Sequence, residues 1–472
     1  MLLPDGFKEM AASLPGLDNA AFLEAMLRAP VTGIRINPSK MSDVAAVGYP
    51  DASPVAWNAE GFVLEERPVF TLNPLLHAGA FYVQDPSSMV YGDLITIALD
   101  SLPETRRRSP RVLDLCASPG GKTTAMIARM PERGVMVANE YVGQRVGALR
   151  ENLTKWGYAP TIICNDDSAS FASVGEVFDI VAVDAPCSGE GMMRKDADAR
   201  AQWDVKLTEQ CAALQREILS NACKALRPGG ILIYSTCTFN LTENEENLAY
   251  LVEKEGLSPI DSGLVGKGGI LPALAYSYPA LRFMPHSTRG EGLFAAILRK
   301  PECDAEESSE PGLIYTGHNE RKEKKGKKRN ADTPYYTRDV LSWLDESGSW
   351  ILREEGRKIV ALTEEIAITL SLLEDKVKTV SRGVQVAELK GKEYVPTTEL
   401  VLSTRFNPSS LPSSDLDIDT ALSYLRGEAI HIDDAPKGYV AVTYKNIPLG
   451  IVKNLGQRAN NLYPQQWKIR HL

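Results

Sequence analysis

The sequence predicts an α/β fold in which helices cover both faces of a mostly parallel sheet. Strand-like apolar runs alternate with helix-length segments from Val112 to about residue 300, and this alternation is typical of parallel sheets. A glycine-rich turn at Gly120 and Gly121 follows the first run, and Cys187 and Cys237 each follow a later one. Because ligands bind beyond the carboxyl ends of such strands, these features predict a functional crevice there.

The chain length and composition are typical of a soluble protein with several domains. Its 472 residues exceed the size that one hydrophobic core usually serves, so we expect three or more domains. No apolar run approaches the roughly 20 residues of a membrane helix, and residues 1–5 lack the features of a signal peptide. We expect a cytoplasmic monomer that binds no membrane.

The cysteines and histidines indicate neither a disulfide framework nor a metal site. Seven cysteines are too few for such a framework in a chain of this length. The zinc spacings Cys-x-x-Cys and His-x-x-x-His are absent, and the five histidines are scattered. We therefore expect reduced thiols and no metal. We also expect Cys303 to be exposed, and small buried apolar roles for Cys116, Cys164, Cys211 and Cys223.

The amino-terminal residues predict an α+β region over residues 1–90. Residues 1 to about 30 have helical apolar spacing at Phe22, Leu23, Met26 and Leu27, and a strand is expected at Val31–Ile36.

Residues 91–300 contain the regular alternation of strands and helices. Strands are expected at Val112–Ala117, Val135–Asn139, Thr161–Cys164, Phe178–Val183, Ile231–Tyr234 and Leu293–Leu298. Helices are expected at Gly143–Trp156, Lys206–Leu226 and Glu243–Lys254.

The remaining residues predict a linker and two small domains. Residues 301–334 are rich in charge, Pro, Ser and Gly, as in a flexible linker. Residues 335–395 predict a small α+β domain, and residues 396–472 a β-rich one with a strand at Gly438–Tyr444.

Charge is unevenly distributed, so a basic face is expected on this acidic protein. The net charge is −9, yet residues 437–472 contain no acidic residue, and Arg321–Arg329 adds a second basic cluster. The basic residues of the first segment are Lys437, Lys445, Lys453, Arg458, Lys468 and Arg470.

The glycine-rich turn predicts a site for a nucleoside cofactor. The segment Cys116-Ala117-Ser118-Pro119-Gly120-Gly121-Lys122-Thr123 brings a backbone without Cβ atoms close to a ligand. A phosphate-binding loop would need glycine at Cys116, and the Gly-x-Gly-x-x-Gly of a dinucleotide site is absent. The remaining alternative is a nucleoside without a pyrophosphate.

Two acidic residues after the next strands support this interpretation. Glu140 could accept both ribose hydroxyls, and Asp167 could contact an adenine amine. Either acid alone is more typical of a surface charge or a helix cap. The turn and both acids in strand order favour S-adenosylmethionine as the cofactor. Tyr141 could stack on the adenine or lie in the core.

The cysteine motifs and the turn resemble those of the Nop/Sun family of RNA cytosine-5 methyltransferases. The resemblance covers about residues 30–300, in Gln84–Met89, Asp114–Lys122, Asp184–Gly191, Ser235–Thr238 and Glu243–Glu245. It implies a Rossmann-like class I core with one antiparallel strand. Residues 116–122, Glu140, Asp167 and Asp184 would then bind S-adenosylmethionine.

The same resemblance implies a role for each polar residue of the crevice. Cys237 would add to C6 of cytosine, because C5 is a poor nucleophile until the ring loses its aromaticity. Cys187 would assist proton removal and release, Asp184 would hold the base at N3, and Lys122 would favour the thiolate or position the base. The target base must be flipped out or unpaired. Arg35, Asn37 and Lys40 match a family segment near the RNA path.

The carboxy-terminal segment suggests the RNA substrate. Residues 439–467 are similar to the PUA-like module of bacterial small-subunit ribosomal RNA methyltransferases, which implies 16S ribosomal RNA near the decoding centre, or the 30S subunit, as partner. Its aromatic residues could stack on bases, although Tyr439 and Trp467 better fit a small β core.

Three other functions remain as alternatives: a transfer RNA methyltransferase, a DNA cytosine-5 methyltransferase and a ribosome-assembly factor without activity. The DNA enzyme would use Cys187 as nucleophile and leave Cys237 unexplained. The intact crevice residues argue against the assembly factor.

Overall fold

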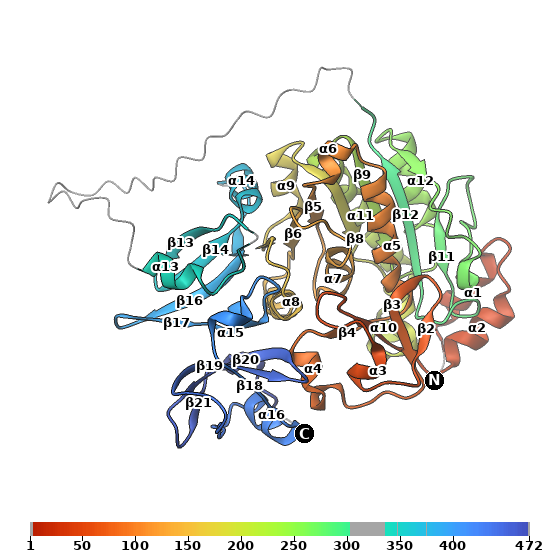
Figure 1. Ribbon diagram of the computed structural model, residues 1–472. Coiled ribbons are helices and arrows are strands. Elements are labelled where there is room, and N and C mark those ends of the chain that lie inside the picture. The colour runs from red at the N-terminus through yellow and green to blue at the C-terminus, as the bar shows by residue number, and fades with distance from the viewer. Residues whose placement is uncertain (1–2, 303–335, 347, 374, 471–472) are drawn as a thin grey trace. The chain divides into compact units, whose positions relative to one another are not determined.

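The computed structural model describes residues 3–302, 336–346, 348–373 and 375–470 (Figure 1). Most of the predicted linker, with Cys303 and the basic cluster Arg321–Arg329, lies outside the described residues. Contacts divide the chain into two compact units. The first holds Met1–Trp156, Thr161–Cys303 and Leu373–Ser381, and the second holds Gly157–Pro160, Asp304–Leu372 and Arg382–Leu472. The division into five predicted segments, the linker included, stays a prediction.

An antiparallel sheet and two helices form the amino-terminal α+β region. Helices α1 (Asp5–Ser13) and α2 (Asn19–Leu27) replace the single predicted helical stretch, and Asp18 caps α2 by accepting the Ala21 N–H. The strand order is β2-β3-β1-β4, with β1 at Thr32–Ile36, β2 at Ser53–Val55, β3 at Asn58–Leu64 and β4 at Phe81–Val83. Short helical segments are α3 (Val44–Val47), η1 (Phe70–Leu72), α4 (Pro74–His77) and η2 (Ser87–Val90).

A nine-stranded sheet forms the centre of the first unit, in the order β10-β12-β9-β8-β5-β6-β7-β15 with β11 beside β12. Strands β5 to β9 pair in parallel and β12 pairs antiparallel to β9, as expected. The strands are β5 (Arg111–Asp114), β6 (Val135–Asn139), β7 (Thr161–Cys164), β8 (Phe178–Asp184), β9 (Leu226–Thr236), β10 (Ser258–Ile260), β11 (Leu281–Phe283), β12 (Leu293–Arg299) and β15 (Thr379–Arg382).

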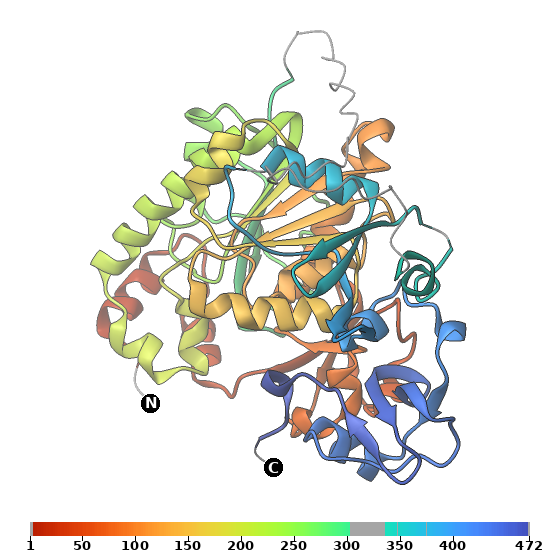
Figure 2. The same cartoon turned by 90° about the vertical axis from the view of Figure 1, so that its left-hand side faces the viewer.

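Helices lie on both faces of this sheet (Figures 1 and 2). Helix α5 packs against α7, and α11 packs against α9. Near-continuous apolar runs such as that of β8 suit strands that are buried on both faces. The helical segments are α5 (Tyr91–Asp100), α6 (Glu104–Arg107), α7 (Gly121–Ile127), α8 (Gly143–Trp156), α9 (Ser168–Val174), η3 (Glu190–Arg194), α10 (Ala197–Gln202), α11 (Val205–Ala225), α12 (Glu245–Glu253) and η4 (Lys267–Gly269).

Two strand limits differ from the sequence prediction by three or more residues. Strand β5 ends at Asp114, not at Ala117, because the chain turns there toward α7 and the Ala117 N–H bonds to Asn139 O. Strand β9 begins at Leu226, before the predicted Ile231. Its Pro-Gly-Gly segment resembles a loop in sequence, but pairing with β8 continues across a bulge.

The second unit contains two small sheets. The first has the order β13-β14-β16-β17, formed by Ile351–Glu355, Lys358–Leu362, Val384–Lys390 and Glu393–Pro396. The second has the order β18-β19-β20-β21, formed by Ser413–Asp415, Gly438–Tyr444, Ile447–Asn454 and Ala459–Asn461. The helices are α13 (Tyr336–Leu341), α14 (Glu364–Leu373), α15 (Thr398–Leu402) and α16 (Ile418–Leu425), with η5 (Pro408–Ser410) and η6 (Gln465–Trp467).

Tyr439 and Trp467 pack against other residues of their domain. This agrees with the expectation that they belong to a small β core. Tyr439 packs partly buried against a core cluster that includes Leu400 and Ile451. Trp467 contacts the ring of Tyr463, which is buried.

The segment 35–40, which is similar to a family segment near the RNA path, has a structural role in the first unit, and contact with RNA stays a prediction. Arg35 and Asn37 are both 1% exposed. Asn37 donates to the carbonyls of Gly79 and Trp156, and Lys40 donates to those of Ala78 and Lys155. These side chains therefore tie the amino-terminal sheet to the end of α8, a pattern that sequence spacing could not reveal.

A buried histidine makes stability depend on pH. His77 is 5% exposed, its Nε2 bonds to Thr71 O at 3.0 Å, and burial lowers its pKa to about 4. In the unfolded chain His77 takes up a proton near pH 6.5, whereas in the folded chain His77 stays neutral at that pH. Stability should therefore fall by about 2–3 kcal/mol as pH drops from about 6.5 to 4.5.

Urea unfolding of His77→Phe at several pH values should show a shallower decline over this range. The exposed His431, replaced by Gln, is the control and should keep the decline of the parent chain. An equally steep decline in His77→Phe would contradict the assignment.

Candidate active site

The neighbouring strands β9, β8, β5 and β6 have their carboxyl ends at the same edge of the large sheet. The parallel register aligns Asp114 of β5 with Ala182 of β8, and Asp184 of β8 with Ser235 of β9. The glycine turn and both cysteine loops leave the sheet at this edge. The structure therefore brings the predicted crevice residues together.

The glycine-rich turn is a fixed backbone cradle. Gly120 has φ of 108°, a conformation that favours glycine, and α7 begins at the next residue. Arg145 Nη2 donates to Ser118 O at 2.7 Å, and Asn152 donates to Pro119 O at 2.8 Å. A Cβ atom on Gly121 would lie 3.2 Å from the ring of Tyr82. Side chains of α8 and β4 thus fix the position of the turn. Its main chain suits a ligand that approaches closely.

Glu140 lies at the end of β6 beside this turn and is 4% exposed. Its Oε1 accepts the Val142 N–H at 2.7 Å, and its Oε2 lies 3.3 Å from Arg145 Nη1. Each carboxylate oxygen keeps a second lone pair, so the group fits the predicted ribose contact.

Asp167 and Tyr141 have less specific surroundings. Asp167 is exposed and accepts the Ala169 N–H at 2.7 Å, as the cap of α9. This is the helix-cap alternative, and the adenine contact stays a prediction. Tyr141 is 70% exposed, which excludes a core role and leaves its ring open to stacking.

Lys122 and Asp184 form an ion pair in the crevice. Lys122 Nζ lies 2.5 Å from Asp184 Oδ2, and Ser235 donates to Asp184 Oδ1 at 2.8 Å. Burial opposes the charge of Lys122, but the facing carboxylate outweighs it and raises the pKa of the amine. A fixed anion and a fixed cation therefore face the cysteines.

The two cysteines contact each other directly. Cys187 Sγ lies 3.2 Å from Cys237 Sγ. The hydrogen bond from the Cys187 thiol lowers the pKa of Cys237, and the charge of Lys122 lowers it further. The same bond raises the pKa of Cys187 well above its usual value, and burial adds to this. These directions favour Cys237 as the first of the two thiols to ionise, with Cys187 as the donor to it.

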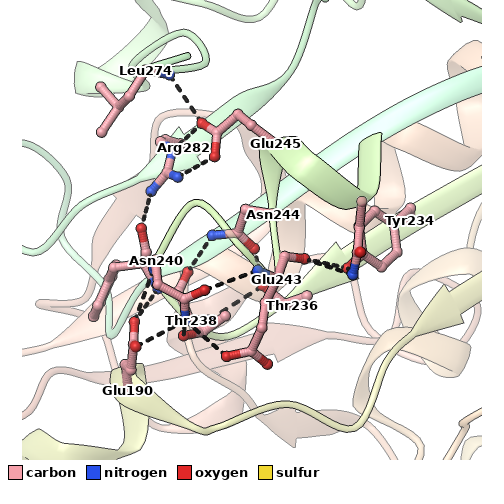
Figure 3. A network of polar contacts seen from close by, with 12 residues as sticks. Glu190, Tyr234, Thr236, Thr238, Asn240, Glu243, Asn244, Glu245, Leu274 and Arg282 are labelled. Carbon is pink, nitrogen blue, oxygen red and sulfur yellow. Dashed lines mark hydrogen bonds and ion pairs between the residues drawn. The ribbon is translucent and has the colours of Figure 1, made fainter. Parts of the chain in front are cut away.

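A buried polar network holds the two cysteine loops together (Figure 3). Glu243 is 0% exposed and accepts from the Ser188 N–H at 3.0 Å, from Ser188 Oγ, from Gln215 Nε2 and from Asn240 Nδ2. Glu190, also 0% exposed, accepts from the N–H groups of Phe239 and Asn240. Each carboxylate thus joins the loop after β8 to the loop after β9.

Close backbone contact and a buried ion pair complete this network. The Gly191 N–H donates to Cys237 O at 2.8 Å, and a Cβ atom on Gly191 would lie 2.9 Å from that oxygen. Arg282 and Glu245 form an ion pair with 0% exposure of either side chain. The sequence motifs contain Glu190, Glu243 and Glu245 but predict no role for them. Acidic residues inside an otherwise small and polar motif were the available signal.

The other described cysteines separate into two groups. Cys164 and Cys223 are buried, as expected. Cys116 and Cys211 are only partly buried, so the expectation was wrong for them. Cys116 lies in the turn after the shortened β5, and Cys211 lies near the start of α11.

Within the described residues, no group of three or more His, Cys, Asp or Glu side chains could hold a metal ion. Among the same residues, no helix has the length and apolar character needed to cross a membrane.

Family models match most of the chain. The model described as 16S rRNA methyltransferase RsmB/F matches residues 103–299. The N-terminal domain of 16S rRNA methyltransferase RsmF matches residues 3–86, and the methyltransferase RsmF PUA domain matches residues 412–469. The chain thus has a methyltransferase core, an amino-terminal domain and a carboxy-terminal PUA domain, as the sequence predicted.

Similar proteins cover nearly the full length. The chain is 32% identical to the ribosomal RNA small subunit methyltransferase F of Enterobacter sp. (strain 638), over 99% of this chain and 96% of that protein. It is 33% identical to the protein of the same name from Salmonella agona (strain SL483), over 98% and 96%.

Solved structures share the core. A methyltransferase homologue from Pyrococcus horikoshii is 28% identical with a TM-score of 0.52, over 62% of this chain and 94% of that one. NSun6 from Pyrococcus horikoshii, solved with SFG, has a TM-score of 0.53 over 64% and 99%, and its 20% identity shows the fold alone.

The contact between the thiols predicts a selective thiolate at Cys237. Iodoacetamide should modify Cys237 at lower pH than Cys187, because only thiolates react. Cys187→Ala removes the donor, so the midpoint of Cys237 alkylation should move to higher pH, as measured by mass spectrometry. Cys211→Ala should leave it in place. An unchanged midpoint in Cys187→Ala would show that the contact does not tune Cys237.

The network predicts a stability cost at Glu243. Glu243→Gln places an amide N–H₂ against buried donors, which should lower the free energy of unfolding by about 1–3 kcal/mol. The matched control is Glu246→Gln, three residues later in the first turn of α12, where a half-exposed carboxylate lies 3.7 Å from Arg216. Chemical denaturation measures both variants. Equal stabilities would refute the role of Glu243.

Proposed function

Because this chain belongs to the ribosomal RNA small subunit methyltransferase F family, we propose that it methylates C5 of cytosine in 16S ribosomal RNA through a covalent Cys237 adduct. The observation that carries the proposal is the pair of thiols 3.2 Å apart beside Asp184 and Lys122. A single thiol would serve addition alone, whereas two thiols in contact serve addition and release.

The crevice fits S-adenosylmethionine, which supplies an electrophilic methyl group when bound. The main chain of residues 116–121 would face the cofactor, and the buried Glu140 would accept from the ribose hydroxyls. Asp167 and Asp184 complete the proposed set. The contacts of Asp167 with its own helix make it the least supported member.

Cys237 begins the reaction as a thiolate. Its sulfur adds to C6 of the flipped cytosine, the C5–C6 double bond opens, and C5 becomes nucleophilic. Asp184 would hold the base through a proton that N3 takes up from solvent as the ring gains the displaced charge, because N3 without a proton offers the carboxylate no donor. Lys122 offsets the negative charge of Asp184 beside the thiolate, which would otherwise disfavour it. C5 would then take the methyl group from the bound cofactor, whose sulfur would keep the electron pair of the broken carbon–sulfur bond.

Cys187 serves the release step. Its pKa in the resting site is raised mainly by the hydrogen bond to Cys237, and adduct formation removes this cause. After losing its own proton to solvent, Cys187 accepts the C5 proton. The bond between Cys237 and C6 then breaks, and its electron pair returns to Cys237 sulfur.

The pKa directions favour this order over the alternative in which Cys187 adds to the base. The nucleophile of a DNA cytosine-5 methyltransferase would be Cys187, the thiol whose pKa is raised. That alternative also leaves the lowered pKa of Cys237 without a use.

The substrate assignment rests on the carboxy-terminal PUA domain and on the relatives. The basic residues of 437–472 supply salt-dependent phosphate contacts. The partner is then 16S ribosomal RNA, free or in the 30S subunit, near the decoding centre. The proposed location is the cytoplasm, where this RNA is found.

Transfer of tritium from labelled S-adenosylmethionine tests the function. Purified protein is given unmodified 16S RNA, 30S subunits and transfer RNA, and labelled nucleotides are mapped by mass spectrometry. Label at C5 of 16S cytosine supports the proposal. Efficient labelling of transfer RNA alone would favour the transfer RNA alternative, and no labelling of any RNA would favour the assembly factor.

Replacement of each cysteine should have an opposite effect on the amount of covalent RNA adduct. Cys237→Ala should abolish both methylation and covalent trapping by RNA that carries 5-fluorocytosine, because no thiol remains to add at C6. Cys187→Ala should accumulate a covalent RNA adduct, seen as a slow band on a denaturing gel. Trapping retained in Cys237→Ala but lost in Cys187→Ala would reverse the assignment.

A further inference from the structure

Two hydroxyl groups lie in line behind Asp184. Tyr91, the first residue of α5, has its hydroxyl oxygen 2.7 Å from Ser235 Oγ, and Ser235 Oγ lies 2.8 Å from Asp184 Oδ1. Tyr91 and Ser235 are both 0% exposed. The motifs that predicted the crevice include Ser235 without a role and do not include Tyr91.

The proton positions in this line follow from its chemistry. Ser235 has one hydroxyl proton, and it donates that proton to the Asp184 carboxylate. Its oxygen therefore accepts from the Tyr91 hydroxyl. Burial raises the pKa of Tyr91 well above its usual value, so the phenol keeps its proton. The line thus runs in one direction, from Tyr91 through Ser235 to Asp184.

Tyr91 also faces the cation on the other side of Asp184. Lys122 Nζ lies 5.7 Å from the centre of the Tyr91 ring and 2.5 Å from Asp184 Oδ2. One tyrosine therefore contacts both groups that bind the carboxylate. Each Asp184 oxygen is held by a donor, and rotation of the carboxylate would break at least one of these bonds.

We propose that Tyr91 and Ser235 are positioning residues, which orient the Asp184 carboxylate toward the target cytosine from behind the site. This inference rests on the proposed function, because Asp184 acts there on the base. Because both hydroxyl groups are buried, both act through Asp184. Loss of orientation lowers the rate of a positioned reaction far more than it lowers binding.

The expected effects differ between the two hydroxyls. Ser235→Ala removes the donor to Asp184 and should lower kcat about 10–100-fold, since a small displacement of a positioned group has an effect of this order. Tyr91→Phe leaves Ser235 in place and should lower kcat about 3–10-fold by the same reasoning. KM for RNA should change less than about twofold, because phosphate contacts dominate RNA affinity.

A double-mutant cycle separates this line from two independent effects. Tyr91→Phe should have no further effect on kcat in the Ser235→Ala background, because the Tyr91 hydroxyl acts only through Ser235 and phenylalanine keeps the ring that faces Lys122. Ser235→Thr, which keeps a hydroxyl, should recover most of the lost rate. Tyr250→Phe is the matched control, since its hydroxyl donates to Glu255 on a different part of the unit. Thermal unfolding of every variant gives the folded fraction.

Several results would contradict either the positioning role or the proposed function. Multiplicative losses in the double variant would show that Tyr91 does not act through Ser235. Rates equal to the parent in both single variants, or losses that vanish when rates are expressed per folded enzyme, would overturn the positioning role. A parent protein that methylates no cytosine would instead overturn the proposed function.

Discussion

The active crevice depends on two buried carboxylates that hold separate loops together. Glu243 binds donors on the loop that carries Cys187, and Glu190 binds donors on the loop that carries Cys237. A buried carboxylate without hydrogen-bond partners is strongly unfavourable, so each loop supplies the donors that keep the other in place. The distance of 3.2 Å between the two sulfurs is a consequence of this mutual requirement.

Proximity gives two identical thiols different properties. Only one of them can donate in the contact, and the cation of Lys122 favours the negative charge on Cys237. The donor, Cys187, becomes harder to ionise as its partner becomes easier. In the proposed reaction, adduct formation reverses this relation, so the state of the site itself decides which thiol acts next.

Around the crevice, buried charges are held by hydrogen bonds rather than left isolated. Arg282 meets Glu245 in a fully buried pair. Arg35 instead donates to Gln84 and Thr124 and stacks over Trp156 at 4.5 Å, and burial lowers its pKa to about 9. Since Arg35 of β1 also donates to Gly121 O, the amino-terminal sheet supports the glycine turn. This support gives the amino-terminal region a structural share in the site.

The sequence alone determined the parallel core, the glycine turn and the two cysteine motifs, because apolar periodicity and residues with special backbone freedom act locally. It also predicted that Cys187, Cys237, Asp184 and Lys122 share a crevice, since parallel strands end on one side of their sheet. It could not tell that Arg35 and Asn37 are buried or that Tyr141 is exposed. The pairing of Glu243 with Ser188, and of Tyr91 with Ser235, joins residues far apart in the chain. The opposite shifts in the pKa of the two thiols, and the hydrogen bonds that hold Asp184, were therefore decided only by the tertiary structure, because hydrogen bonds depend on positions in space and not on sequence spacing.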